Sequence, residues 1–201
     1  MEYNMRKATF LALALLLAAG AAFAANELIV TEIMYNSTEA TDVEWFEVYN
    51  NSGATLDLTG WYVLDDDLGH TPAALSGTMA PGEVKVVVGT MATFTAKYPT
   101  VTNYFPSTFQ PGFSFNNAGD QINIFDAAAQ PVYALIFDDT APWPTAADGS
   151  GPSLLLLSNN CADFNDAACW TVGITDGTPG VLTQTVGNED LSWGLVKGLY
   201  R

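Results

Sequence analysis

The sequence has 201 residues and carries 22 acidic against 6 basic side chains, which gives a formal net charge of −16 at pH 7. Proteins bind nucleic-acid phosphates mainly through lysine and arginine, so this balance argues against a nucleic-acid partner. The length is that of about one domain, and 12% aromatic residues are enough to build a buried core.

The first 24 residues have the pattern of a cleaved signal peptide. Arg6 and Lys7 precede an apolar run at residues 8–19, and the Ala-Phe-Ala of residues 22–24 fits a small-x-small cleavage site. The run is shorter than the roughly 20 apolar residues that span a bilayer. We therefore predict a signal peptide at residues 1–24, export to the cell surface, the medium or the periplasm, and no stable membrane span in the mature chain.

The rest of the chain is dominated by short apolar runs divided by Gly, Pro, Asn and Asp, which predicts one all-β domain over residues 26–185. Alternating polarity predicts strands at residues 28–34, 44–49 and 58–64. The strand at 44–49 is expected to be half-buried, because alternate residues of a strand face opposite sides of a sheet. A fourth strand at 83–88 is the most continuously β-branched run and is expected in the middle of a sheet.

The second half of the chain is less regular. Prolines interrupt residues 90–113 and leave room for one short helix at 91–98. Residues 121–126 and 132–137 predict a hairpin. Residues 186–201 form a separate tail, in which apolar residues at roughly helical spacing follow an acidic start. We interpret this tail as a docking or sorting segment, or as a short helix packed on its own domain.

Several motifs resemble those of the lamin-tail domain family in their residues and in their order along the chain. They include Glu-Ile-Met-Tyr-Asn at residues 32–36, Glu-Trp-Phe-Glu-Val-Tyr-Asn at 44–50, Gly-Asp followed by a strand at 119–126, and Gly-Thr-Pro-Gly at 177–180. The resemblance implies an immunoglobulin-like β-sandwich with no catalytic set, in a family whose bacterial members are secreted or surface modules. It also implies a structural or surface role for Glu32, Glu44 and Glu47.

Cys161 and Cys169 are the only cysteines of the sequence. An even pair in an exported chain predicts a disulfide. Their spacing differs from the Cys-x-x-Cys of redox motifs, and a zinc site needs about four ligands where His70 is the only histidine.

Five aspartates in predicted loops are candidate calcium ligands, because a sandwich gathers its loops at its two ends. They are Asp65, Asp67, Asp138, Asp139 and Asp148. The run from Asp65 to His70 lacks the ligand spacing of an EF-hand. The alternative is that these residues are solvated and stabilise turns. Calcium binding stays open, and no other cofactor is expected.

Three aromatic residues are candidate contacts for a partner: Trp45, Tyr49 and Trp143. Their rings can supply a large, rigid contact area. The alternative, burial in the sandwich core, is favoured for Trp45. For Trp143, which stands between two prolines, both interpretations have equal weight.

These observations favour a secreted, non-catalytic binding or adhesion module whose partner is an envelope or extracellular protein or polysaccharide. Nucleophilic catalysis would depend on His70, and the sequence has no Gly-x-Ser-x-Gly elbow. Two alternatives remain. One is a metal-dependent hydrolase, either a phosphoesterase or a nuclease, which the near absence of histidine disfavours. The other is a structural surface protein that self-associates.

Overall fold

The structure is a computed structural model that describes residues 26–39 and 43–183. The predicted signal peptide at residues 1–24 and the predicted tail at 186–201 lie outside the described residues. The strands are β1 (Leu28–Met34), β2 (Trp45–Asn50), β3 (Leu56–Asp57), β4 (Tyr62–Leu64), β5 (Ala73–Ala74), β6 (Thr78–Met79), β7 (Val84–Val88), β8 (Tyr104–Thr108), β9 (Asp120–Phe125), β10 (Pro131–Phe137), β11 (Pro152–Leu156) and β12 (Trp170–Thr175). The helices are α2 (Met91–Lys97) and the 3-10 turns η1 (Thr145–Ala147) and η2 (Ala167–Cys169).

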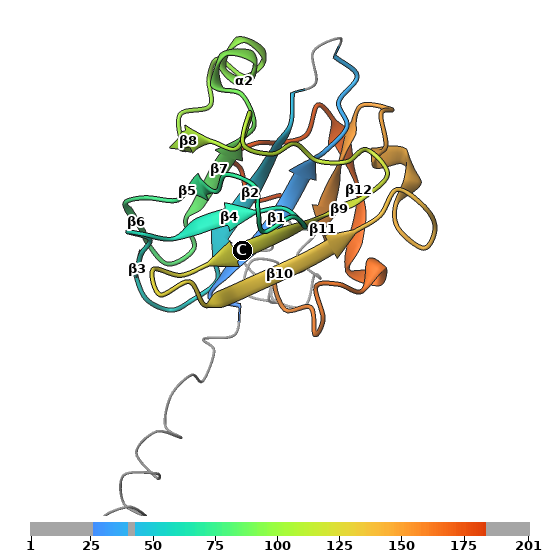
Figure 1. The fold of residues 1–201 in the computed structure, drawn as a ribbon. Helices are drawn as coiled ribbons and strands as arrows, with labels where there is room; N and C mark the ends of the chain where they lie inside the picture. The colour runs from blue at the N-terminus through green and yellow to red at the C-terminus, as the bar shows by residue number, and fades with distance from the viewer. Residues whose placement is uncertain (1–25, 40–42, 184–201) are drawn as a thin grey trace, which may run out of the picture.

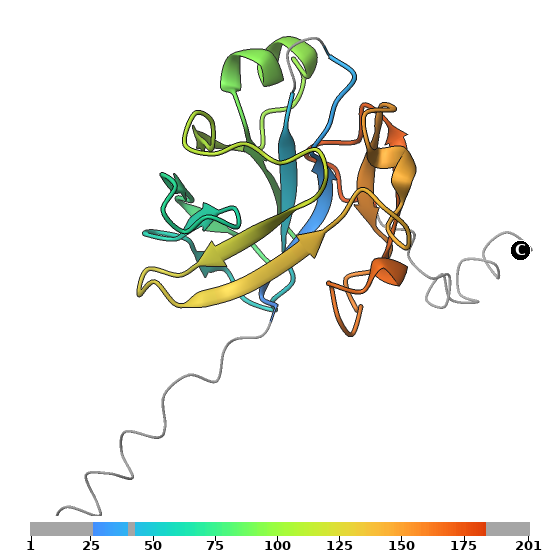
Figure 2. The ribbon, with the colours of Figure 1, turned by 45° about the vertical axis from the view of Figure 1, so that its right-hand side comes forward.

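Two sheets face each other across a common core and form an immunoglobulin-like β-sandwich (Figures 1 and 2). One sheet has six strands in the order β12-β11-β1-β2-β7-β8, and the other has four in the order β10-β9-β4-β5. A two-stranded ribbon pairs β3 with β6. The pairing is antiparallel except between β7 and β8, which run parallel. The predicted all-β sandwich is therefore confirmed.

The core between the sheets is built from alternate residues of the strands and from a group of phenylalanines. Phe109 stacks on Phe113 with ring centroids 4.9 Å apart, and Phe115 contacts Phe46, Phe109 and Phe137. All three phenylalanines follow β8: Phe109 and Phe113 lie at the end of the proline-interrupted stretch 90–113, and Phe115 comes just after it. This stretch is a connection that fills the core, which is why it is rich in aromatic residues.

The outer face of the six-stranded sheet is also buried. The ring of Phe94 on α2 lies in a second hydrophobic cluster with Met34, Trp45, Val86 and Val88. Residues 176–181, which we call the covering segment, return from β12 over the same face, where they bond to β1 and β2 side chains. The prediction that the strand at 44–49 is half-buried is therefore wrong, because elements remote in sequence cover its second side.

The other predicted elements are found with small differences. The helix and the hairpin are confirmed as α2 and as β9 with β10. The single strand expected at 58–64 is interrupted, because the Trp61 amide bonds back to the Leu58 carbonyl and Gly60 has φ +81°. β7 lies inside the sheet, between β2 and the edge strand β8. No helix among the described residues is long and apolar enough to cross a membrane.

Candidate functional site

Two glutamates stand directly opposite each other on the outer face of the six-stranded sheet. The register pairs Glu32 of β1 with Glu47 of β2, after a bulge in β1 between Val30 and Glu32. Each side chain is only 1% exposed. Like charges directly opposite in a sheet are destabilising, and burial of an ionised carboxylate is more costly still. Both groups therefore need hydrogen-bond donors or a proton.

The covering segment provides most of these donors. The Thr178 amide donates to both Glu32 oxygens at 3.0 and 3.2 Å, and the Thr178 hydroxyl donates to Oε2 at 2.7 Å. The Ser153 hydroxyl adds a 2.5 Å bond to Glu32. Glu47 accepts from the Gly180 amide at 2.9 Å and from the Thr31 hydroxyl at 2.7 Å. The Gly-Thr-Pro-Gly motif at residues 177–180 thus contacts Glu32 and Glu47 directly.

Helix α2 and the covering segment are also tied to each other. The Tyr98 hydroxyl donates to the Asp176 carbonyl at 2.7 Å and accepts from the Trp45 indole at 3.2 Å. Lys97 bridges the carboxylates of Asp176 and Glu39 at 2.7 and 2.5 Å. Helix α2 and the covering segment, which are bonded to each other, consequently cover the outer face of this sheet.

Burial, with a smaller contribution from the neighbouring Glu32, raises the pKa of Glu47 to about 7, although the Thr31 hydroxyl and the Gly180 amide oppose the shift. Burial likewise raises the pKa of Glu32. Two carboxyls with raised pKa values are a common sign of a catalytic pair. Here both are closed off from solvent and hydrogen-bonded to the protein itself, and these bonds hold the covering segment on β1 and β2.

Glu44, the third acid of the opening motif, is 3% exposed and lies just before β2. Its Oε2 accepts from the Gln110 amide group at 2.9 Å and from the Phe115 backbone at 3.2 Å. It therefore anchors the aromatic connection that follows β8.

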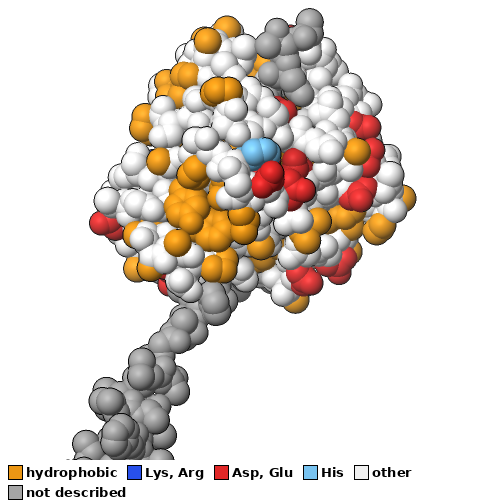
Figure 3. Space-filling model, in the orientation of Figure 1, with side chains coloured by type: hydrophobic (Ala, Val, Ile, Leu, Met, Phe, Trp, Pro, Cys, Tyr) orange, Lys and Arg blue, Asp and Glu red, His pale blue; other side chains and the backbone are white. Residues whose placement is uncertain are grey.

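The predicted calcium ligands form two separate groups. Asp65 lies with Asp66 and Asp120, so that one carboxylate oxygen of each falls within 4.8 Å of the others. The buried Asp65 carboxylate already holds the His70 Nδ1 at 2.8 Å and raises the pKa of His70 chiefly through this hydrogen bond. Asp67 accepts from the Gly69 amide in its own turn. Acidic side chains beside the histidine are visible in Figure 3.

Burial raises the pKa of Tyr35, and the charges of the other three aspartates, Asp148, Asp139 and Asp138, raise it further. Asp138 accepts from the Thr140 amide and hydroxyl, and Asp148 accepts from the Asn36 side chain at 2.6 Å. Turn bonds describe Asp67 and Asp138 without a cation, and Asp148 is held by a bond from Asn36, 112 positions away in the sequence. Calcium binding by these loops stays a prediction.

Cys161 and Cys169 are joined by a disulfide with their Cα atoms 6.2 Å apart. The closed loop carries Asn165, whose side chain accepts from the Ile136 amide at 2.7 Å and donates to the Ala134 carbonyl at 3.4 Å. Both bonds fall on the free side of β10. The side-chain amide of Asn165 thus makes hydrogen bonds that a neighbouring strand would otherwise make at this edge of the four-stranded sheet.

The three predicted aromatic contacts are not brought together on an open surface. Trp45 is fully buried under α2, which is the alternative that the sequence favoured, so it does not offer a contact for a partner. Tyr49 is partly buried. Trp143 is partly buried against Trp170, with ring centroids 6.2 Å apart. It belongs to the edge of the core.

The outer face of the four-stranded sheet is open and carries different aromatics. Tyr62 of β4 and Phe125 of β9 are direct cross-strand partners, with rings stacked 5.0 Å apart and 12° from parallel. Both rings are partly exposed, and Figure 3 shows a hydrophobic cluster over β4. Further along the same face are the outward side chains of Gln121, Asn123, Ala134 and Ile136, the last 55% exposed. None of these outward residues is charged.

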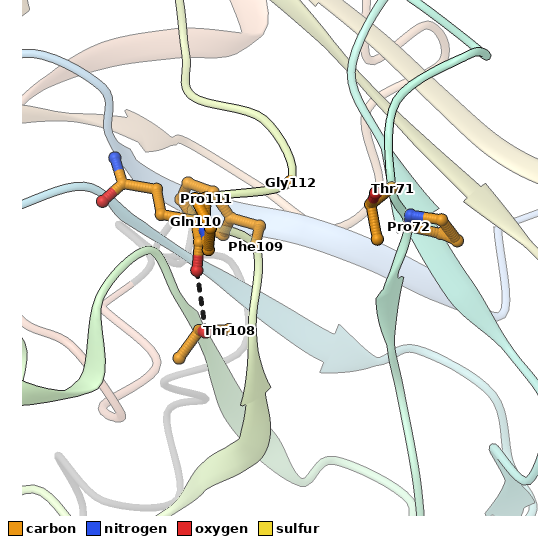
Figure 4. Close-up of a pocket in the computed structure, with 7 residues that line it drawn as sticks. All are labelled: Thr71, Pro72, Thr108, Phe109, Gln110, Pro111 and Gly112. Atoms are coloured by element: carbon orange, nitrogen blue, oxygen red, sulfur yellow. Dashed lines mark hydrogen bonds between the residues drawn. The ribbon is translucent and has the colours of Figure 1, made fainter.

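A small hollow lies beside this sheet, between the loop before β5 and the loop after β8 (Figure 4). Its volume is about 280 Å³, at the low end for ligand pockets. Its lining is Thr71, Pro72, Thr108, Phe109, Gln110, Pro111 and Gly112. These residues include no ionisable side chain, so the hollow offers contacts and hydrogen bonds but no general acid, base or metal ligand of its own.

The profile described as Lamin Tail Domain matches residues 21–136, more than half of the chain. The chain belongs to the lamin tail domain family. The matched part runs from before β1 into β10 and includes the opening acids, the aromatic connection and the Tyr62–Phe125 pair. β11, β12 and the covering segment follow it. No curated protein matches the sequence.

Sequence reasoning missed Tyr62 and Phe125 as contact candidates, although a signal for them was present. In β9 the apolar Ile122 and Ile124 alternate with Gln121, Asn123 and Phe125. Phe125 therefore falls on the polar side of an otherwise regular alternation, where an aromatic residue has no core to fill.

Proposed function

We propose that this lamin tail domain protein is a secreted, non-catalytic binding or adhesion module of the cell envelope or extracellular space, and that it holds its partner on the open face of the four-stranded sheet. The observation that carries the proposal is the uncharged face around Tyr62 and Phe125 on a chain with net charge −16. Exposed apolar surface of this kind marks interaction sites.

The contrast with the rest of the surface supports this assignment. Acidic side chains stand on the loops at the sheet ends, whereas the outward residues of β4, β9 and β10 offer rings and amides. Aromatic rings and neutral amides suit a protein surface or a polysaccharide, in which apolar faces alternate with hydroxyl groups. The disulfide is of the kind that persists outside the reducing cytoplasm, which supports export.

A retention experiment tests the proposal. The mature protein, residues 25–201, would be mixed with envelope and medium fractions and with purified envelope polysaccharide, in buffers containing calcium or a chelator. We expect retention by the wild-type protein, and loss of retention in the double variant Tyr62→Ala/Phe125→Ala. Loss of retention with the chelator would add the acidic loops to the mechanism.

The matched control is Leu68→Ala, which removes a 64% exposed hydrophobic side chain from a loop outside the sheet face. It should be retained like the wild-type protein. Equal retention of the double variant and the wild-type protein would move the contact to another surface. If the wild-type protein is retained by none of the fractions, the protein is not a binding module of this kind.

A further inference from the structure

The two sheets have four edge strands, and three of them are protected against pairing with another chain. β8 contains Pro106, which lacks a backbone donor. β10 begins with Pro131 and is bonded along its free side by the Asn165 side chain. β5 has only two residues, too few for a ladder. Short edges, prolines and bonded edges are the usual means of preventing edge-to-edge association.

β12 is longer than β5 and lacks a proline, and the one irregularity in its ladder with β11 is a register shift between Val172 and Thr175. It runs for six residues, Trp170–Thr175, without a proline or a charged residue, and it pairs only with β11. Val172 is 39% exposed and Ile174 is 61% exposed. β-branched, uncharged edge strands of this length are templates for the addition of another strand.

The pairing pattern shows which backbone groups of β12 are available. The Leu157 amide donates to the Cys169 carbonyl, so Cys169 faces β11. Residues of an antiparallel ladder alternate between facing the neighbouring strand and facing away. Because Leu155 pairs with Thr171 and Leu154 with Val172, the amides of Trp170 and Val172 are directed away from β11. The Trp170 amide donates to the Ala167 carbonyl of the preceding 3-10 turn, so the Val172 amide is the one that faces the free side of the sheet.

Charge restricts what can approach this edge. Two copies of a chain with net charge −16 repel each other wherever their acidic surfaces meet. A contact between copies therefore needs a stretch that is neutral on both sides, and a strand that pairs with itself across a two-fold axis must be free of charge to avoid placing like charges opposite each other. β12 meets this condition.

We propose that β12 is a self-association edge, at which a second copy of this chain pairs its own β12 antiparallel across a two-fold axis. The two six-stranded sheets then form one continuous sheet, with Val172 and Ile174 of both copies near its centre. The face around Tyr62 and Phe125 belongs to the other sheet and remains open in each copy.

The test is the oligomeric state of residues 25–201, measured by sedimentation from low micromolar to millimolar concentration at about 0.5 M salt, which screens the acidic repulsion. We expect a dimer that forms with rising concentration. Ile174→Glu should raise the dissociation constant of the dimer at least tenfold, because the substitution places two carboxylates, one from each copy, where the two β12 strands meet. Ile136→Glu is the matched control, since Ile136 is 55% exposed on the edge strand that Asn165 already bonds.

Hydrogen exchange gives a second readout that does not depend on a variant. The Val172 amide should exchange quickly in dilute protein and slowly in concentrated protein, whereas the Thr171 amide should be protected in both. A monomer at all concentrations, or a dimer that Ile174→Glu leaves intact, would overturn the proposal. Protection of the Val172 amide in the monomer would also overturn it, because another part of the same chain would then occupy the edge.

Discussion

The outer faces of the two sheets differ in their exposure to solvent. The outer face of the six-stranded sheet carries the opposed Glu32 and Glu47, yet it is buried under α2 and the covering segment. The outer face of the four-stranded sheet carries neutral and aromatic side chains, yet it is open. The charged face is hidden because its carboxylates bind backbone amides of the covering segment. The apolar face is exposed because no described segment is bonded across it.

The largest effect should come from removal of the Glu32 carboxylate. Glu32→Ala leaves the Thr178 amide and the Ser153 hydroxyl without their acceptor and detaches the covering segment. We expect a loss of about 3 kcal/mol in the free energy of unfolding, measured with urea. Glu27→Ala, at a partly exposed position before β1, should change it by less than about 0.5 kcal/mol. Equal effects of the two substitutions would mean that the covering segment is held by other contacts.

A clash under the covering segment should have the next largest effect. Gly177 has φ +66°, and a Cβ there would lie 2.7 Å from the Trp45 ring and 2.8 Å from Glu32 Oε1. Gly77 has φ +78° with no atom within 4 Å of such a Cβ, so Gly77→Ala measures the cost of backbone strain without a steric clash. Gly77→Ala should cost about 1 kcal/mol and Gly177→Ala about 2 kcal/mol more. Equal Tm values for the two variants would show that the segment moves aside freely.

The raised pKa of Glu47 predicts how stability depends on pH. The folded protein keeps the Glu47 proton up to about pH 7, whereas the unfolded chain releases it near its ordinary value of 4.5. The stabilising contribution is therefore complete below about pH 4.5 and is lost as the pH rises through 7. The Tm should be several degrees higher at pH 5 than at pH 8.

The pKa values of His70, Glu32 and Asp120 are also raised and act in the same direction, so the wild-type slope contains these groups as well as Glu47. Glu47→Gln should remove the Glu47 part and flatten the profile between pH 5 and 8. A slope unchanged by Glu47→Gln but removed by His70→Asn would assign the dependence to the Asp65–His70 pair instead.

The smallest effect on stability should come from the open face. The Tyr62–Phe125 pair is a single cross-strand contact of partly exposed rings, so the double alanine variant should lose only about 1 kcal/mol. Its loss of partner retention should nevertheless be large. Thermal unfolding and the retention experiment on the same samples would compare the two. A stability loss as large as that of Glu32→Ala would place the pair in the core and not on a contact face.

The strands and the fold class were predictable because alternation and turn residues are local signals. β1 has the predicted bounds, and β2, β7, α2 and the β9–β10 hairpin lie within one or two residues of them. Burial on both sides of β2 was not predictable in this way, since it depends on residues 94 and 176–181. Tyr62 and Phe125 are 63 positions apart, and only the register joins them. The five predicted aspartates fell into two groups because sequence places loops at the ends of a sandwich but does not say which loops meet.

The bond between Glu32 and Thr178 spans 146 positions of the chain. In a polypeptide made from its N-terminus, β1 and β2 are complete long before residues 176–181, which carry the Thr178 and Gly180 donors. Contacts of such long range form slowly and late. The outer face of the six-stranded sheet is therefore among the last parts of the fold to close.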